Sequence, residues 1–265
     1  MQYETLDLEI VLDGKIAFLM LERSDARNAI NDVMVAELHH ALEALAADPI
    51  VRVIVLYGHG RYFSIGTDVG WLQSLVSGSR DQRLDEARKM AALLHVLNNY
   101  PKPVIGWARG YVMGMAVGLL ACCDVVMLEE GTRLRLSETH LGLVPSIVAP
   151  YLIARCGQRA FRRMGVTGAW VEADYAVLIG LAASVYPKNL LRGKVDYEAA
   201  EAIKSAPGAI AQTKAFANDL ALFPGVDLVE TTALQLADQL ESDEARDGIA
   251  AAVTELAPPW APAKR

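Results

Sequence analysis

YFSIGTD, residues 62–68, and ARGYVMGMAVGLLACCD, residues 108–124, are the two stretches that decide the fold. Each ends a hydrophobic run of the β type in backbone that contains glycine. Glycine accepts conformations that other residues avoid, so such stretches can direct two main-chain N–H groups at one substrate oxygen. LSETHLGLVP comes next and holds Glu138, a lone carboxylate in an otherwise apolar setting. Together these segments predict a site that polarises a carbonyl group and moves a proton beside it.

The composition predicts one large globular domain, or a domain with an appendage. The chain has 265 residues, of which 53% are hydrophobic, and this is enough to bury a full core. A net charge of −7 argues against a nucleic-acid-binding surface, which needs clustered Lys and Arg. Cys122, Cys123 and Cys156 have neither metal-ligand spacing nor the even number of a disulfide framework. A reducing cytoplasm is therefore expected, and no metal site is predicted.

Neither a secretory signal nor a membrane-spanning segment is expected. The first ten residues contain Glu4, Asp7 and Glu9, whereas a signal peptide opens on basic and then apolar residues. The longest uncharged run covers residues 110–123 and is too short for a membrane span. That length is typical of a buried core element.

The order of the first predicted elements is that of an α/β protein. Residues 8–23 alternate apolar and polar side chains around Asp13-Gly14, which predicts a β-hairpin. Apolar residues at helical spacing predict a helix over residues 28–48. A buried strand is predicted to follow over residues 51–58, so that strand, helix and strand succeed one another.

This rhythm continues toward the C-terminus. Residues 69–99 predict a polar helical segment that covers the site, and after a further strand residues 114–122 predict a buried helix. After Pro207 the pattern is wholly helical and ends in a proline-rich tail. We therefore divide the chain into a core of residues 1–200 and a C-terminal helical oligomerisation region of residues 201–265.

Five segments, in their order and spacing, resemble the crotonase superfamily of enoyl-CoA hydratases and isomerases over nearly the whole chain. They are ERSDARNAIN (22–31), VIVLYGHGRYFSIGTD (53–68), PKPVIGWARGYVMGMAVGLLACCDVV (101–126), RLRLSETHLGLVPS (133–146), and VTG followed by AVLIGLAASVYP. The resemblance implies an α/β fold, a crotonase-like spiral of ββα units with a C-terminal helical region. It also implies an acyl-CoA thioester substrate and a homotrimer or homohexamer. No separate cofactor is implied, since coenzyme A is part of the substrate.

By the same resemblance, the catalytic groups are the backbone N–H groups of Thr67 and Met115, which form the oxyanion hole, and the carboxylate of Glu138. The family's hydratases use two glutamates, and the first of these falls on Gly118. Glycine cannot activate water, so hydration does not follow from the fold alone. A free carboxylate of the substrate, in the space vacated at Gly118, is one candidate for the second carboxylate.

A narrower resemblance decides the predicted substrate. SIGTDVGWLQ, GLLACCDVV, LSETHLGLVPSIVAP and SDEARDGIAAAVTELAPPW resemble the bacterial 3-methylglutaconyl-CoA hydratases of leucine breakdown. They also resemble the isohexenylglutaconyl-CoA hydratases of acyclic terpene breakdown. In that subgroup a glycine at the first position accompanies a glutamate at the second. The predicted enzyme is a hydro-lyase that adds water across the 2,3 double bond of a 3-branched glutaconyl-CoA.

Further residues are predicted to contact the substrate or its CoA, and all lie in or beside the segments above. They are Arg27, Arg61, Ser64, Ile65, Gly66, Asp68, Gly114, Gly118 and His140. Arg27 and Arg61 are candidates for the CoA phosphates, although a solvated surface arginine is equally common. Thr67 and Asp68 can also cap the helix that follows them. His140 can equally be a packed or exposed histidine.

Other functions stay open beside this prediction. A double-bond isomerase, or a general enoyl-CoA hydratase, could use Glu138 as a single proton shuttle. A non-catalytic acyl-CoA- or RNA-binding protein is the alternative from another class, and the acidic charge and Glu138 count against it. Nucleotide and serine-hydrolase chemistry have no support, because residues 58–60 lack the third glycine of a dinucleotide fingerprint and no nucleophile elbow occurs.

Overall fold

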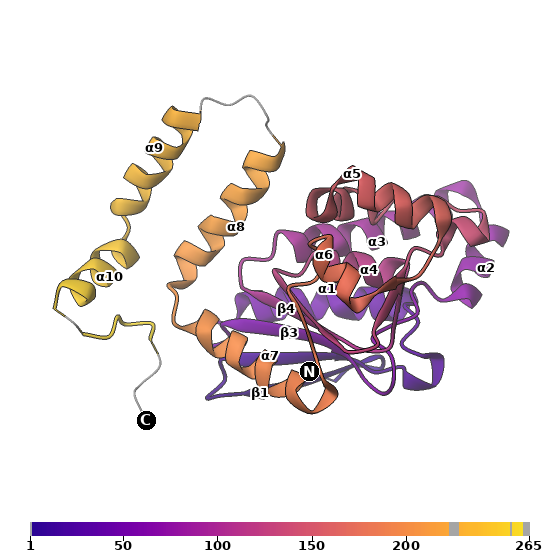
Figure 1. Cartoon of the computed structure of the whole chain (residues 1–265), viewed down its shortest axis with the longest axis horizontal. Helices are drawn as coiled ribbons and strands as arrows, with labels where there is room; N and C mark the ends of the chain where they lie inside the picture. The colour runs from indigo at the N-terminus through magenta and orange to yellow at the C-terminus, as the bar shows by residue number, and fades with distance from the viewer. Residues whose placement is uncertain (1, 223–227, 255, 262–265) are drawn as a thin grey trace.

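A six-stranded sheet forms the centre of the computed structural model, which describes residues 2–222, 228–254 and 256–261 (Figure 1). Its strands lie in the order β1-β2-β3-β4-β6-β9. They are β1 (Leu6–Val11), β2 (Ile16–Leu21), β3 (Val53–Gly58), β4 (Val104–Ala108), β6 (Val125–Glu129) and β9 (Ser184–Tyr186). β1 runs antiparallel to β2, and every later pair is parallel. The predicted α/β fold is confirmed.

The first two strands form the predicted hairpin. Val11 pairs with Ile16, and the turn between them contains Leu12, Asp13 and Gly14. These three residues have φ angles of 54°, 55° and 86°. Asp and Gly accept such left-handed backbone, which matches the right-handed twist of the two strands.

A second, smaller sheet stands at the edge where the candidate site lies. It contains β5 (Tyr111–Met113), β7 (Arg133–Arg135) and β8 (Val171–Glu172). β5 and β7 are parallel, with Met113 opposite Arg135, and β7 and β8 are antiparallel. In β7 the central Leu134 is fully buried while its two arginine neighbours are partly exposed, so the arginines share the other face of this sheet.

Helices cover both faces of the large sheet. On β2, Ile16 and Phe18 pack toward α7 (Lys188–Ile203), whereas Leu19 and Leu21 belong to the larger core on the opposite face. Among the helices that contribute to that core are α1 (Asp32–Ala47), α3 (Arg80–Asn98), α4 (Met115–Ala121) and α5 (Ala149–Thr167). Strands buried on both faces read as continuous apolar runs, as β2 and β3 do.

Two helical boundaries differ from the sequence-based prediction. α1 begins at Asp32 and not at residue 28, because Asn28 adopts a left-handed conformation with a φ of 55°. Asn31 caps the helix by accepting a hydrogen bond from the N–H of Met34. The polar segment over residues 69–99 forms two helices, α2 (Val69–Ser77) and α3, separated by a capping box at Ser79.

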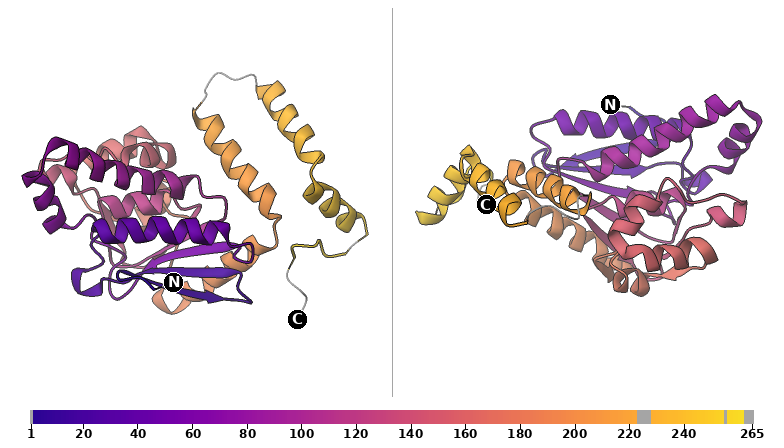
Figure 2. Two further views of the ribbon diagram at one scale, coloured as in Figure 1. Left: turned by 180° about the vertical axis from the view of Figure 1, so that it is seen from behind. Right: turned by 90° about the horizontal axis from the view of Figure 1, so that it is seen from above.

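Most of the described residues beyond α7 form three helices. α8 (Pro207–Leu222), α9 (Leu228–Leu240) and α10 (Asp243–Val253) extend to one side of the α/β body (Figures 1 and 2). Lys214 on α8 holds this region to the body by donating hydrogen bonds to Asp124 Oδ2 (2.6 Å) and to the carbonyl oxygen of Lys102 (3.0 Å). The division of the chain near residue 200 stays a prediction.

The remaining short helix, α6 (Ala173–Leu178), connects β8 with β9. None of the helices in the described part of the chain has both the length and the apolar character that a membrane crossing needs.

Candidate active site

Two loops that leave neighbouring parallel strands touch each other at the edge of the sheet. The loop after β3 pairs with β5, because Ser64 N–H donates to the carbonyl of Tyr111 (3.3 Å) and Met113 N–H donates to the carbonyl of Ser64 (3.1 Å). Gly66 has a φ of 88°, and a Cβ at this position would lie 2.5 Å from the carbonyl oxygen of Met113. Only glycine permits that approach. The two stretches that decide the fold are therefore in direct backbone contact.

The N–H group of Thr67 has no partner in the loop that carries it. Ile30 and Thr67 form a parallel β-bridge in which Ile30 N–H donates to the carbonyl of Gly66 and Asp68 N–H donates to the carbonyl of Ile30, each at 2.8 Å. The bridge uses the groups of the residues on either side of Thr67, so its own N–H faces away from Ile30. No backbone carbonyl within the described ranges accepts it.

The second free N–H group belongs to Met115, the first residue of α4. The first N–H groups of a helix have no acceptor within it. Gly114, which precedes the helix with a φ of 50°, donates its own N–H to the carbonyl of Arg135 (3.0 Å). Among the backbone groups that the structure describes, none accepts the N–H of Met115. Thr67 and Met115 line one cavity, but their role as an oxyanion hole stays a prediction.

Glu138 begins a short 3-10 helix (Glu138–Leu141), and its carboxylate lies against Gly114. A Cβ added to Gly114 would lie 3.2 Å from Glu138 Oε1. Oε2 is buried and has no hydrogen-bond partner among the described residues. Burial raises the pKa of Glu138. Backbone hydrogen bonds at Glu138 and Ser137 lower it by less, so the pKa lies above its usual value. A carboxylate in this state is a strong proton acceptor.

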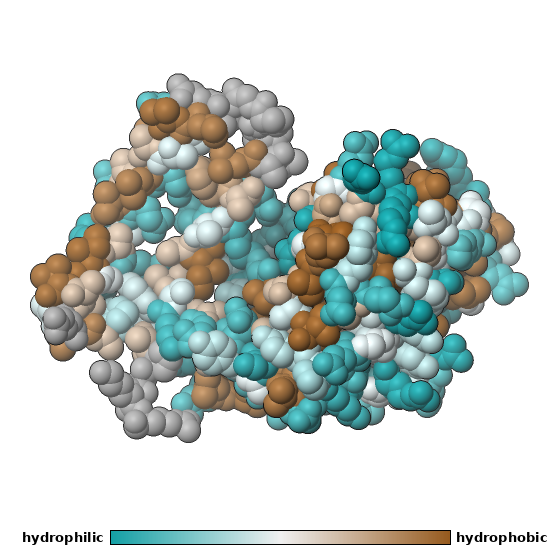
Figure 3. Space-filling model, viewed as in Figure 1, coloured by the Kyte–Doolittle hydropathy of each residue, from teal (hydrophilic) through white to brown (hydrophobic). Residues whose placement is uncertain are grey.

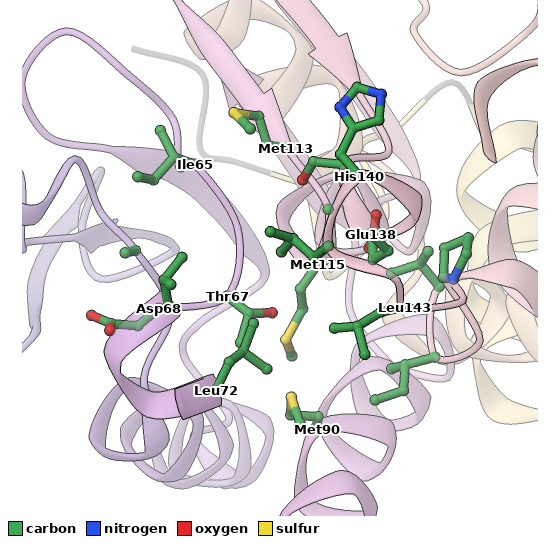
Figure 4. Close-up of a pocket in the computed structure, with 18 of the residues that line it drawn as sticks. Ile65, Thr67, Asp68, Leu72, Met90, Met113, Met115, Glu138, His140 and Leu143 are labelled. Carbon is green, nitrogen blue, oxygen red and sulfur yellow. The ribbon is translucent and has the colours of Figure 1, made fainter. Parts of the chain in front are cut away.

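These groups face a cavity of about 710 Å³, a volume typical of small-molecule sites. Seven of the predicted site residues line it, namely Ile65, Thr67, Asp68, Gly114, Met115, Glu138 and His140. Figure 4 shows Met115 pointing toward Met90, with Leu72 and Leu143 on either side. We call Leu72, Met90, Met115, Leu143 and Val148 the apolar wall of the cavity.

The five other predicted residues, of which Gly118 is described below, lie outside the lining of the cavity. Ser64 is fully buried, and its Oγ accepts a hydrogen bond from the N–H of Gly66 (3.1 Å), so both support the loop. Arg27 and Arg61 are exposed, and the guanidinium carbon of Arg61 lies 5.9 Å from the ring centroid of Tyr62. Their contact with CoA phosphates stays a prediction.

Gly118 requires a correction, because the space beside it is already filled. A Cβ at Gly118 would lie 2.5 Å from Val148 Cγ1 and 2.9 Å from Leu94 Cδ1. Gly118 is buried in α4 and does not line the cavity. The expectation that a substrate carboxylate occupies this space is therefore wrong. Packing, and not a vacant site, accompanies the missing glutamate.

Asp68 has a structural role in this arrangement. Its Oδ1 accepts hydrogen bonds from the N–H groups of Gly70 (2.9 Å) and Trp71 (3.2 Å), and its Oδ2 pairs with Arg23 (3.2 Å). Burial raises the pKa of Asp68, but the hydrogen bond from Trp71 and the contact with Arg23 outweigh it and hold the pKa below its usual value. Asp68 is thus an ionised helix cap, and of the carboxylates that line the cavity Glu138 is the one with an unpartnered oxygen.

Sequence reasoning missed two residues that matter here. The buried amide of Asn28 donates to the carbonyls of His59 (2.9 Å), Tyr62 (2.9 Å) and Phe63 (3.1 Å), which fixes the loop before Thr67. The polar cluster in residues 22–31 was the available signal. Arg135 lines the cavity, and its position two residues after Arg133 on a short strand indicated a shared face.

The comparisons with known proteins agree with this geometry. A family model described as enoyl-CoA hydratase/isomerase matches residues 12–262. A putative enoyl-CoA hydratase of Thermus thermophilus is 30% identical over 241 residues, which cover 90% of this chain and 94% of the relative. The 2,3-dehydroadipyl-CoA hydratase of Escherichia coli is 31% identical over 186 residues, covering 69% of this chain and 71% of the relative.

Solved structures give the same result for the fold. The crystal structure of an enoyl-CoA hydratase from Shewanella pealeana superposes with a TM-score of 0.93 at 27% identity. The superposition covers 98% of this chain and 97% of the other. The C-terminal helices are therefore part of the shared architecture.

The packing around Gly118 yields a test by stability. Gly118→Glu should lower the free energy of unfolding by about 2 kcal/mol, because its side chain overlaps Val148. Combining it with Val148→Gly should recover at least about 1 kcal/mol relative to the sum of the single changes. Urea unfolding of the three variants measures this coupling.

Gly193→Glu is the matched control, since a Cβ at this exposed helical position meets nothing within 4 Å. It should not destabilise the protein, because glutamate favours a helix more than glycine does. Strict additivity of Gly118→Glu and Val148→Gly would contradict the steric account.

Proposed function

The chain belongs to the enoyl-CoA hydratase/isomerase family, and from this premise we propose that it adds water across the 2,3 double bond of a 3-branched glutaconyl-CoA. Its activity is of the enoyl-CoA hydratase type and its substrate class is the acyl-CoA thioester. The observation that carries the proposal is one cavity that combines a buried, unpartnered carboxylate oxygen on Glu138 with the free N–H groups of Thr67 and Met115.

In the proposed mechanism, the thioester carbonyl oxygen accepts hydrogen bonds from the N–H groups of Thr67 and Met115. These donors stabilise the enolate that forms when the oxygen of water attacks Cβ of the acyl chain. A donor of this kind lowers the barrier by about 3 kcal/mol. They act from backbone positions fixed before the substrate arrives. No reorganisation of the site is needed during the reaction.

Glu138 carries the proton in both halves of this mechanism. As the ionised carboxylate it orients a water molecule and accepts its proton during attack on Cβ. It then returns that proton to Cα of the enolate, which completes the addition. A single carboxylate suffices because it is a base in the first half and an acid in the second. The raised pKa favours this exchange, since it makes the ionised carboxylate a stronger base toward water than an ordinary glutamate.

Three observations support a branched glutaconyl substrate. The sequence resembles the hydratases of this substrate class around residues 136–150, and the relative from Escherichia coli is named for 2,3-dehydroadipyl-CoA, whose acyl group also ends in a free carboxylate. The apolar wall offers Leu72, Met90 and Leu143 to a hydrocarbon branch at C3. Of the two candidates, isohexenylglutaconyl-CoA has the longer hydrocarbon branch and therefore more apolar surface to place against that wall.

One alternative is favoured by the same lone carboxylate. An enoyl-CoA isomerase removes a proton from one carbon of the acyl chain and returns it to another, so it needs no group that activates water. Glu138 could perform this transfer beside the same two N–H donors. The product distinguishes the two, since only hydration adds the mass of water.

We also propose a homotrimer or homohexamer in the cytoplasm, with residues 201–265 as the oligomerisation region. Leu234, Leu236 and Leu240 on α9 are each more than half exposed. Figure 3 shows apolar side chains along the C-terminal helices. Contact between copies would remove them from water.

The role of the Met115 N–H predicts the effect of a proline. Proline is favourable at the first position of a helix, so Met115→Pro should fold while losing the donor. The catalytic efficiency (kcat/KM) for hydration should fall by about 100-fold. Met115→Leu keeps the N–H and should lose far less. A folded proline variant with full activity would remove Met115 from the mechanism.

The raised pKa of Glu138 predicts the acid limb of the pH profile. Catalytic efficiency should fall as the pH is lowered through the pKa of Glu138, because protonation removes the base, and the midpoint should lie above the value of about 4.3 for an ordinary glutamate. Glu138→Gln should lose at least about 100-fold at neutral pH, and the exposed Glu43→Gln should keep the wild-type profile. Retention of more than about a tenth of the efficiency by Glu138→Gln would exclude it as the principal acid and base.

A substrate panel tests the proposed function itself. Isohexenylglutaconyl-CoA, 3-methylglutaconyl-CoA and crotonyl-CoA are each incubated with the protein, and loss of the conjugated thioester absorbance is followed with mass detection of the product. We expect the branched glutaconyl thioesters to be hydrated at least about tenfold more efficiently than crotonyl-CoA, because remote binding energy positions the enoyl group. Equal or better efficiency with crotonyl-CoA would leave a general hydratase.

A further inference from the structure

Arg135 presents an unused cation to the cavity of Glu138. It stands on β7 opposite Met113 and lines the cavity. Its Nε is buried without a hydrogen-bond partner, and no side chain or carbonyl of the described residues accepts a bond from its guanidinium group. A guanidinium has five N–H donors and remains charged. Buried donors of this kind are nearly always paired in folded proteins, so a missing acceptor indicates a ligand.

The guanidinium group is held in place by an aromatic stack. Its central carbon lies 4.7 Å from the ring centroid of Trp170, which packs against Tyr111 at 4.9 Å. Tyr111 in turn stacks on Tyr62 at 5.1 Å. A cation over an aromatic face is stabilised without using its hydrogen-bond donors. Arg135 is thereby positioned for a planar acceptor such as a carboxylate, which takes two parallel hydrogen bonds from arginine.

Arg133 provides the internal contrast on the same strand. It also lies over Trp170, at 5.6 Å, but it forms an ion pair with Glu172 at 2.6 Å. It does not line the cavity. The two arginines thus share a sheet face and an aromatic partner, while only the one in the cavity lining lacks an acceptor among the described residues.

We propose that Arg135 binds the free carboxylate of the acyl group and thereby determines the specificity for dicarboxylic acyl-CoA substrates. This inference rests on the proposed function and names the residue that would recognise its substrate. The hydrocarbon branch at C3 of the acyl group then lies against the apolar wall. A substrate with one charged and one apolar branch has a matching surface for each.

The place of Arg135 favours the acyl carboxylate over the phosphates of CoA. Its carbonyl oxygen accepts the N–H of Gly114, the residue directly before the Met115 donor, and Glu138 follows three residues later in the chain. The backbone of Arg135 is therefore anchored beside the candidate N–H donor of Met115. The phosphates of CoA are separated from the thioester by the whole pantetheine arm.

Charge balance gives a second reason. The charged side chains in the lining are Asp68, Arg135 and Glu138, and His140 also lines the cavity. Asp68 is paired with Arg23, so a substrate carboxylate would meet the negative charge of Glu138 without compensation if Arg135 were absent. With Arg135 present, the carboxylates of Glu138 and of the substrate share one cation. These three groups together leave a single net negative charge.

The test uses two inert ligands, 3-methylglutaryl-CoA and its methyl ester, in which an uncharged group replaces the carboxylate, together with free CoA. Their dissociation constants are measured by calorimetry for the full-length wild type, Arg135→Met and Arg133→Met. We expect the wild type to bind the acid at least about tenfold more tightly than the ester, and Arg135→Met to reduce this ratio to about one. Arg133→Met should keep the wild-type ratio, although it removes the same charge from the same sheet face.

Three outcomes would overturn the assignment. A wild-type ratio near one would show that no group recognises the carboxylate. A ratio preserved in Arg135→Met would assign the recognition to another cation. An equal weakening of acid, ester and free CoA in Arg135→Met would place a phosphate, and not the acyl carboxylate, on Arg135.

The proposed function is tested separately by the hydration panel. Selective hydration of glutaconyl thioesters with an unchanged ratio in Arg135→Met would keep the function and reject the role of Arg135. A ratio that depends on Arg135, without hydration of glutaconyl thioesters, would keep the carboxylate site and reject the hydratase substrate.

Discussion

The close approach of two backbones at Gly66 and Met113 is the constraint on which the site depends. Parallel strands β3 and β4 deliver their following loops to the same edge of the sheet, and the pairing of Ser64 with β5 joins those loops. A side chain at Gly66 would separate them, because its Cβ would overlap the carbonyl oxygen of Met113. Two free N–H groups can face one cavity only while this contact holds.

The two carboxylates of the cavity, Asp68 and Glu138, show how different surroundings shift the pKa of the same chemical group in opposite directions. Asp68 accepts two backbone N–H groups and a guanidinium, so its pKa is lowered and its charge is used for structure. Glu138 is buried with one oxygen unpartnered, so its pKa is raised and it remains reactive. Groups whose surroundings shift their pKa values in opposite directions are the usual acid–base candidates. Of these two carboxylates, Glu138 is therefore the candidate for the proton carrier of the proposed mechanism.

The absence of a second glutamate is built into the core of the protein. Val148 and Leu94 occupy the volume into which a side chain at position 118 would extend. Val148 also contributes to the apolar wall, so the same residue fills the core beside Gly118 and lines the cavity. The filled space beside Gly118 and part of the apolar wall are therefore two consequences of one packing arrangement.

The sequence by itself determined the hairpin, the α/β order and the two loops that contain glycine, and it pointed to Glu138 as the candidate carboxylate. These depend on local patterns and on spacing along the chain, which remain readable without a structure. Tertiary structure alone decided that α1 starts at Asp32, because Asn28 turns its amide toward the loop at Phe63.

Tertiary structure also decided that Gly118 is packed and that Arg135 faces the cavity without a partner. The physical reason is the same in both cases. Whether a space is filled or a charge is paired depends on residues far away in the sequence, here Val148 for Gly118 and Trp170 for Arg135, and only folding brings them into contact.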